Sequence, residues 1–152
     1  NAGTGTGTGA GSEERVAIVF CDLDGFKEIN DSLGHAAGDD VLRVIGSRLV
    51  QTLRGSDIVA RIGGDEFLVL VRYLPLDWDQ AAFLARLRRA VEQPVQVAGR
   101  RVQPGLSLGM AVSPPDTRDL TALVQQADER MYDDKVARRA ARDGHREQLT
   151  LP

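Results

Sequence analysis

Two short segments concentrate carboxylates beside residues that form strands. Residues 63–66 read Gly-Gly-Asp-Glu and join two strand-forming runs, 57–62 and 66–73. Asp22 and Asp24 directly follow another apolar run. Adjacent carboxylates repel each other, so either a cation or bulk water must offset their charge. Oxygen-only ligands suit Mg²⁺, and carboxylates from two strands can support phosphoryl or nucleotidyl transfer with two metal ions about 3.5–4 Å apart.

Each acid taken alone has a simpler explanation. Carboxylates in loops are usually just hydrated, and no single one of these residues requires a ligand. The two clusters together favour a shared site, because Asp22 and Asp65 would meet at one end of a sheet if the first strand lies beside the hairpin. The functional interpretation depends on that juxtaposition.

The spacing of apolar residues predicts the element order β-α-α-β-β-α-β-β-α. A hairpin in the middle of the chain excludes a purely parallel sheet. We therefore expect an α/β chain of the α+β kind, with a central, mostly antiparallel five-stranded sheet flanked by helices. The expected strands are 15–23, 57–62, 66–73, 94–99 and 100–112, and the expected helices are 26–33, 38–54, 78–92 and 119–142.

Four residues mark expected boundaries or irregularities of these elements. Gly34 is expected to end the first helix, and Asp39 is available to cap the start of the second. Pro94 is expected to end the third helix. Pro104 interrupts the last expected strand, which favours an edge position or a bulge there.

The composition is that of an ordinary globular domain. The chain has 152 residues, of which 42% are apolar and 27% charged, enough for one core. No run approaches the roughly 20 apolar residues that span a bilayer, and no signal peptide opens the sequence. A net charge of -3 gives no reason to expect nucleic acid as a partner. Metal ions and a few placed cations would still let an acidic protein bind an anionic ligand.

The sequence predicts one domain, 15–145, between a flexible Gly/Thr-rich leader at 1–14 and a short tail at 146–152. Cys21 is the only cysteine, so an internal disulfide is excluded, which fits a reducing compartment. We expect a cytoplasmic domain, either free or as the cytoplasmic part of a larger membrane-anchored protein.

Four motifs occur together in this chain. Residues 63–67 read GGDEF and residues 22–42 read DLDGFKEINDSLGHAAGDDVL. Residues 106–111 read LSLGMA and residues 127–135 read ADERMYDDK. Together they resemble the GGDEF domain of diguanylate cyclases, which condense two GTP into cyclic di-GMP. The resemblance covers residues 15–139 and implies a palm-like sheet of the nucleotide-cyclase kind.

The resemblance implies a metal site at the acidic clusters. Asp22 and Asp65 match the family's metal-binding carboxylates, and the backbone carbonyl of Leu23 matches a further ligand. The implied cofactor is Mg²⁺ or Mn²⁺. Such an ion would neutralise phosphate charge while a ribose 3′-hydroxyl approaches an α-phosphate.

The other residues of the hairpin motif also have implied roles. Glu66 lies beside the metal site and could hold a second metal ion or take the 3′-hydroxyl proton, and the sequence leaves both roles open. Gly63 and Gly64 lack Cβ atoms, so the hairpin backbone can approach a nucleotide closely.

Asn30 and Asp39 match the family's guanine-binding residues. An ionised Asp can accept hydrogen bonds from two neighbouring guanine donors, which adenine does not offer. Without the resemblance, Asp39 would be interpreted as a helix cap and Asn30 as a turn residue. Phe26 and Leu42 would form apolar walls of the guanine site, although both suit the core equally well.

Lys135 and Arg139 match the family's triphosphate-binding pair. They lie four residues apart and therefore share a helix face. The family's usual glycine before this arginine is Arg138 here. An arginine-rich helix face is more often simply solvated. Further candidate phosphate ligands are the backbone amides of Gly25 and Phe26 and the side chain of Lys27.

Arg54 and Asp57 have the R-x-x-D form at the family's product-inhibition offset, five residues before the first glycine of the hairpin. Arg can bind phosphate or stack on guanine, and Asp can bind the edge of guanine. The resemblance therefore implies an inhibitory site for cyclic di-GMP. His35, beside Gly34, is interpreted as a structural hydrogen-bonding residue rather than a catalyst.

One part of the family pattern is missing from this sequence. The family opens with a D-x-L-T-G-L-x-N-R segment and a helix before the first strand. Here the Gly/Thr-rich leader stands in that place, with Asn1 as a candidate remnant. The missing segment would line the nucleotide pocket and join a regulatory domain, so we expect its absence to affect nucleotide affinity, full activity and control, but not the core motifs.

Three functions are compatible with these observations. The first is an active cyclase, in which two domains that each hold one GTP form a homodimer, at least transiently. The second is a regulatory module that binds GTP or cyclic di-GMP without turnover. The third is a generic Mg²⁺-dependent nucleotidyl transferase or nucleotide cyclase. Further regulatory domains are expected in the full-length protein.

Overall fold

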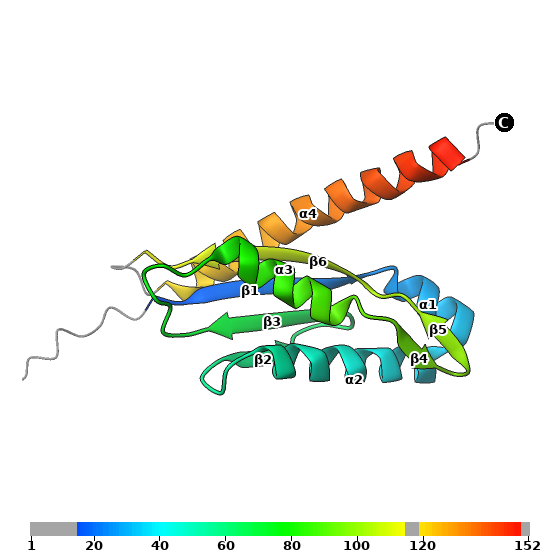
Figure 1. Cartoon of the computed structure of the whole chain (residues 1–152), viewed down its shortest axis with the longest axis horizontal. Helices are drawn as coiled ribbons and strands as arrows, with labels where there is room; N and C mark the ends of the chain where they lie inside the picture. The colour runs from blue at the N-terminus through cyan, green and yellow to red at the C-terminus, as the bar shows by residue number, and fades with distance from the viewer. Residues whose placement is uncertain (1–14, 115–118, 150–152) are drawn as a thin grey trace, which may run out of the picture.

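The computed structural model describes residues 15–114 and 119–149, so the predicted leader and the last residues of the predicted tail lie outside the described part. Six strands and four helices follow one another along this part (Figure 1). None of these helices combines the length and the apolar composition that crossing a bilayer requires. The elements are β1 (Ala17–Asp24), α1 (Phe26–Leu33), α2 (His35–Thr52), β2 (Ile58–Arg61), β3 (Glu66–Val71), α3 (Gln80–Val91), β4 (Val95–Val97), β5 (Arg100–Val102), β6 (Gly105–Val112) and α4 (Leu120–Leu149).

β1 lies inside an antiparallel sheet with the strand order β2-β3-β1-β6. Every residue of β1 is buried, because both of its edges are paired and helices cover both of its faces. β3 alternates instead, with Phe67, Val69 and Val71 buried and the residues between them half-buried. The expected α+β fold with a mostly antiparallel sheet is confirmed.

The prediction of five strands in one sheet is wrong. Among the described residues the sheet has four strands, and β4 and β5 form a separate two-stranded hairpin. The strand expected at 100–112 is split between β5 and β6, because Pro104 has no N–H to donate to a ladder. Ala98 and Gly99 form the turn of the small hairpin with φ of 50° and 71°.

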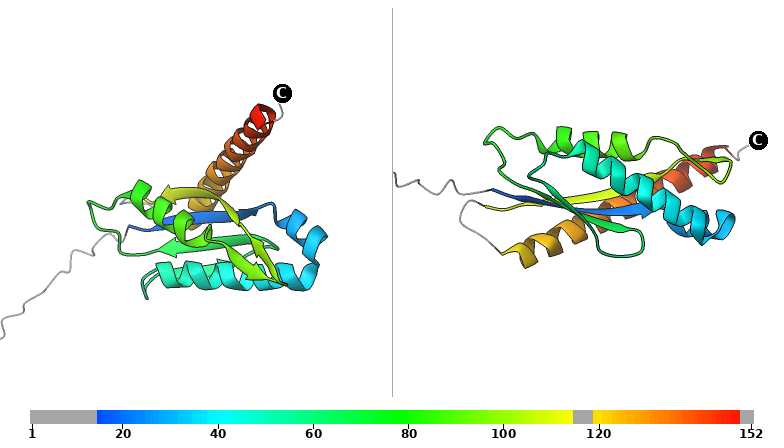
Figure 2. Two further views of the ribbon diagram at one scale, coloured as in Figure 1. Left: turned by 45° about the vertical axis from the view of Figure 1, so that its right-hand side comes forward. Right: turned by 90° about the horizontal axis from the view of Figure 1, so that it is seen from below.

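Helices cover both faces of the sheet, and each face has its own apolar core. α2 and α3 pack on one face, where Ile45, Leu49 and Leu87 are fully buried. These residues lie at the helical spacing that the sequence predicts. α4 covers the other face, where Phe20 and Met131 belong to a smaller core. Figure 2 shows α4 crossing the sheet and projecting beyond it.

Gly34 separates α1 from α2 with a φ of 91°, which confirms it as the end of the first helix. α2 begins at His35, directly after this glycine, because Gly34 provides the sharp change of direction that starts the helix. Asp39 therefore lies inside α2, and the prediction that it caps the helix is wrong. α4 continues to Leu149 and includes the first residues of the predicted tail.

Gly109 of β6 should not accept a side chain. An added Cβ would collide with the backbone of α4 at Ala127, Arg130 and Met131. We expect Gly109→Ala to lower the free energy of unfolding by about 1–3 kcal/mol, as overpacking of cores does. Chemical denaturation measures this change. Gly144→Ala is the matched control, because an added Cβ there meets nothing within 4 Å, and equal stability of the two variants would contradict the prediction.

Candidate functional site

The acidic ends of β1 and of the β2–β3 hairpin meet. Asp22 lies opposite Glu66 in the register of β1 and β3. The Leu23 amide donates to the Asp65 carbonyl at 3.1 Å. Residues paired across a sheet share a face, so Asp22 and Glu66 are both on the side that α4 covers. The predicted juxtaposition of the two clusters is confirmed, whereas the roles of the residues stay predictions.

Asp22 is a buried carboxylate beside other acids. It is 6% exposed, and burial raises the pKa of its carboxyl. The charges of Asp65 and Glu66 add to this rise, and the ammonium group of Lys135, 3.0 Å from Asp22 Oδ1, opposes it. This oxygen accepts no well-aligned hydrogen bond from the described residues. Among the described residues this oxygen therefore faces a cation, Lys135, and no neutral donor.

The place where Asp22, Asp65 and Glu66 meet is called the acidic corner below. Its donor set fits Mg²⁺. No group of three or more His, Cys, Asp or Glu side chains converges within residues 15–114 and 119–149. Mg²⁺ does not require such a group, because it usually binds one or two carboxylates and completes its octahedron with water and phosphate oxygens. Asp22, Asp65 and the carbonyl of Leu23 offer oxygen donors of this kind.

The two glycines of the hairpin differ in their surroundings. A Cβ on Gly63 would lie 2.8 Å from Glu66 Oε2, so this glycine leaves room for the acid. A Cβ on Gly64 would meet nothing within 4 Å. The outer side of the turn is therefore open, which is compatible with the predicted approach of a nucleotide.

A hollow of about 550 Å³ lies beside the acids, between the start of α1 and α4. Gly25, with a φ of 71°, turns the chain from β1 into α1 at its edge. Arg142, which is not among the predicted residues, also lines it and continues the cationic face of α4. The sequence signal for Arg142 is its spacing of three from Arg139. The predicted residues that line the hollow are Leu23, Gly25, Phe26, Lys27, Asp65, Lys135 and Arg139.

The predicted guanine-binding residues lie on neighbouring helices. Asp39 and Leu42 of α2 line a separate hollow of about 350 Å³ together with Arg61. Asn30 of α1 has a buried side-chain oxygen that no described residue satisfies. Gly38 faces this oxygen and has no room for a Cβ. An unsatisfied buried oxygen is compatible with recognition of a polar ligand, and the guanine-binding role stays a prediction.

Arg54 and Asp57 lie in the turn between α2 and β2. Asp57 Oδ2 accepts from the Arg54 amide at 3.0 Å, and Asp57 Oδ1 accepts from the Arg72 amide at 3.2 Å. The Asp57 side chain is 2% exposed and the Arg54 side chain 52%. Asp57 therefore orders the turn, and Arg54 presents the accessible charge. The inhibitory role of the pair stays a prediction.

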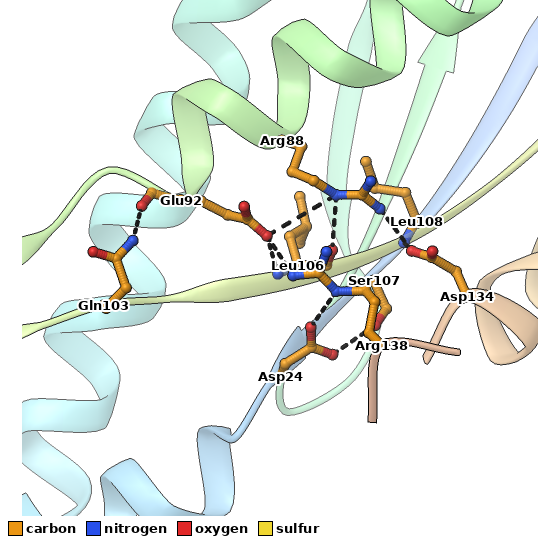
Figure 3. Close-up of polar contacts among 9 residues, drawn as sticks. All are labelled: Asp24, Arg88, Glu92, Gln103, Leu106, Ser107, Leu108, Asp134 and Arg138. Atoms are coloured by element: carbon orange, nitrogen blue, oxygen red, sulfur yellow. Dashed lines mark hydrogen bonds and ion pairs between the residues drawn. The ribbon is translucent and has the colours of Figure 1, made fainter. Parts of the chain in front are cut away.

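A network of charged residues that the sequence analysis missed joins β1, β6, α3 and α4 (Figure 3). Arg138 donates from Nε to Asp24 Oδ2 at 2.9 Å and from Nη2 to Glu92 Oε1 at 2.6 Å. Arg88 Nη2 donates to Asp134 Oδ2 at 2.7 Å. Burial opposes the charge of Arg138, but the hydrogen bond to Asp24 and the charges of Glu92 and Asp134 raise the pKa of its guanidinium overall. The sequence signal for this network is the departure from glycine at position 138.

Cys21 lies next to Asp22 but offers no reactive thiol. It is 0% exposed, and burial, with a contribution from the charge of Asp22, raises its pKa to about 12. The thiolate is therefore negligible at neutral pH. Cys21 acts as a small apolar residue of β1.

The fold and the site define an α+β domain with an acidic corner flanked by cations, which is typical of domains that bind phosphate-bearing ligands with a metal ion. The sequence matches the family described as "Diguanylate cyclase, GGDEF domain" over residues 8–141. The chain therefore belongs to the GGDEF domain family.

Several proteins are similar to this chain in sequence or in structure. Diguanylate cyclase TpbB of Pseudomonas aeruginosa is 42% identical over 134 residues, which cover 88% of this chain and 30% of TpbB. The crystal structure of the TpbB GGDEF domain matches with a TM-score of 0.73 and 42% identity, over 82% of this chain and 78% of that one. Cyclic di-GMP phosphodiesterase NbdA of the same species is 37% identical over 124 residues, which cover 82% of this chain and 16% of NbdA. The chain thus spans less than a third of these two curated relatives.

The raised pKa of Asp22 predicts how this residue affects stability. Because the folded-state pKa lies above the unfolded one, the stabilising contribution of the carboxyl is fully present below the unfolded pKa and is lost as pH rises through the folded value. At neutral pH, Asp22→Asn should therefore raise the melting temperature in metal-free buffer, and the gain should shrink toward acid pH.

Thermal melts of the purified domain at several pH values measure this effect. Asp24→Asn is the matched control and should melt below the wild type, because it removes one partner of the ion pair with Arg138. A lower melting temperature for Asp22→Asn at neutral pH would contradict the prediction.

Proposed function

We propose that this domain is a diguanylate cyclase, which condenses two GTP into cyclic di-GMP and releases two pyrophosphates. One observation carries the proposal: the buried Asp22, whose Oδ1 faces only the Lys135 ammonium among the described residues, lies opposite Glu66 and beside the hollow that Lys135 lines. A divalent cation and a triphosphate would balance the charges on both sides of this corner. The 42% identity to a protein named as a diguanylate cyclase supports the same reaction.

The residues divide the chemistry among them. Asp22, Asp65 and the Leu23 carbonyl would hold Mg²⁺, which when bound supplies charge neutralisation at the α-phosphate. Lys135, Arg139 and the amides at the start of α1 would bind the triphosphate. The new bond joins a ribose 3′-oxygen to the α-phosphorus, the bond from that phosphorus to pyrophosphate breaks, and the 3′-hydroxyl loses its proton. Glu66 would accept this proton or hold a second ion.

Two domains must face each other for this reaction. Each domain would bind one GTP, and each 3′-hydroxyl would attack the α-phosphate in the partner. Dimerisation therefore supplies the positioning that would otherwise cost the entropy of bringing two nucleotides together. Asn30 and Asp39 would select guanine over adenine. The Asn30 oxygen is buried and would stay unpaired with the wrong base, whereas Asp39 is exposed and would bind guanine at the surface of α2.

A second candidate is a module that binds GTP or cyclic di-GMP without turnover. The similarity to NbdA, a protein named as a cyclic di-GMP phosphodiesterase, favours it, because a domain like this one occurs there beside an opposite activity. Binding of cyclic di-GMP by a domain that forms none of it would identify this function.

A turnover assay tests the main proposal. The domain is incubated with GTP and Mg²⁺ at several protein concentrations, and nucleotides are separated by chromatography. Cyclic di-GMP should form, with a rate that rises more steeply than linearly with protein concentration because two domains cooperate. Asp65→Asn should abolish product while leaving the melting temperature nearly unchanged, because Asp65 lies in a turn rather than in the core.

A control variant and a second nucleotide test whether turnover is specific to this site and to GTP. Asp77→Asn removes an exposed loop acid away from the corner and should retain full activity. Parallel incubation with ATP should give no cyclic product, whereas a generic nucleotidyl transferase would use both nucleotides. Absence of cyclic di-GMP from folded wild-type protein at high concentration would reject the cyclase.

The Arg54–Asp57 turn gives a separate prediction about inhibition. Added cyclic di-GMP should slow GTP turnover, and Arg54→Ala should weaken this inhibition by about tenfold or more, since a hydrogen bond to a charged group contributes about 1.5–3 kcal/mol. Arg89→Ala, which removes an exposed arginine of α3, is the control and should be inhibited like the wild type. Equal inhibition of Arg54→Ala and wild type would remove this turn from the inhibitory site.

A further inference from the structure

α4 presents two cations to two acids of β1 in matching register. Lys135 Nζ lies 3.0 Å from Asp22 Oδ1, and Arg138 Nε lies 2.9 Å from Asp24 Oδ2. Residues three apart on a helix share a face, as do residues two apart on a strand. The two ion pairs therefore join the same faces of α4 and β1. Lys135 lines the hollow of the proposed nucleotide site, whereas Arg138 is outside its lining.

Arg138 binds two carboxylates at once. Besides Asp24, it reaches Glu92 Oε1 with Nη2 at 2.6 Å. The Asp24 side chain is 3% exposed, and its Oδ1 accepts from the Ser107 hydroxyl at 2.5 Å. Both oxygens of Asp24 are therefore satisfied, and Arg138 ties the end of β1 to α3 and α4 (Figure 3).

We infer that Arg138 is a positioning residue for the turn that binds metal and phosphate, an inference that rests on the proposed cyclase function. Asp24 lies between Leu23, whose carbonyl is a proposed metal ligand, and Gly25, whose amide is a proposed phosphate ligand. Arg138 fixes Asp24 and so holds both backbone groups. Arg138 also fixes the position of α4 along β1. This position sets the distance of Lys135 from the same turn.

The geometry explains why arginine suits this position. A guanidinium presents several N–H groups in a rigid plane and can bind two carboxylates in different directions, which the single ammonium of lysine does less well. A residue without a charged side chain at this position would leave Asp24 without a cation. Because Asp24 is buried, the loss of its partner would leave an uncompensated charge next to the site.

Four variants separate positioning from mere stability. Arg138→Met keeps the length of the side chain but removes its charge, and Arg138→Lys keeps only the charge. Asp24→Asn/Arg138→Met also removes the buried charge that the first variant leaves unpaired. Arg130→Met is the matched control: Arg130 donates from α4 to the Met110 carbonyl at 2.5 Å and does not line the hollow.

Each variant is compared with the wild type in three measurements: the melting temperature, the Kd of a non-hydrolysable GTP analogue with Mg²⁺ by calorimetry, and KM with kcat for cyclic di-GMP formation. Arg138→Met should raise the Kd and KM roughly ten- to a hundredfold, as loss of residues that orient ligating groups does. Arg138→Lys should lie between it and the wild type. Arg130→Met should lower the melting temperature but leave the Kd unchanged.

The double variant is the critical comparison. It should regain melting temperature relative to Arg138→Met while its Kd stays raised. Two results would overturn the inference: wild-type affinity in Arg138→Met, or a double variant that recovers affinity together with melting temperature. Either result would leave the proposed cyclase function unaffected. Failure of the wild-type domain to bind the analogue would instead reject the proposed function, and the inference with it.

Discussion

The register between α4 and β1 is the constraint on which the site depends. On the face of β1 that α4 covers, Ile18 and Phe20 are apolar, and the alternate positions that follow are acidic. α4 repeats this order, because Met131 packs in the apolar core and the cations follow it along the helix. Hydrophobic burial supplies most of the stabilisation, about 25 cal/mol per Å² of apolar area. The charge pairs then hold one register, because a shift of one residue would rotate each cation about 100° away from its acid.

The clustered carboxylates of the acidic corner destabilise the fold locally. Burial, together with the charges of Asp65 and Glu66, raises the pKa of the Asp22 carboxyl despite the ion pair with Lys135. Asp24, two residues further along the same strand, has a fully satisfied carboxylate instead. The strand thus carries one carboxylate whose partner is Lys135 alone and, two positions later, one whose two oxygens are both satisfied. Only the first retains the capacity to bind a further cation, and the second holds the backbone between them in place.

The sequence predicts the elements that follow from local patterns. Apolar spacing identifies the strands and helices. The sequence predicts that Asp22 meets Asp65 only if the first strand lies beside the hairpin, and the pairing of β1 with β3 fulfils this condition. The sequence does not predict the features that depend on tertiary contacts. Asp39 has the chemistry of a cap, but Gly34 starts α2 earlier. The Arg138 network links residues more than a hundred positions apart in the sequence, such as Asp24 and Arg138, and no local pattern reports such a pair.

The same network also explains why β4 and β5 stay outside the sheet. β6 is an edge strand, and unpaired edge groups would offer a ladder to another strand. Here carboxylates accept hydrogen bonds from the amides of this edge. The Leu106 amide donates to Glu92 Oε1 at 3.1 Å, and the Leu108 amide donates to Asp134 Oδ2 at 2.9 Å. Pro104 ends the hairpin strand just before this edge begins. The carboxylate of Glu92 that closes the edge is also the second partner of Arg138. The end of the sheet and the position of Asp24 beside the proposed site are therefore set by one group of charges.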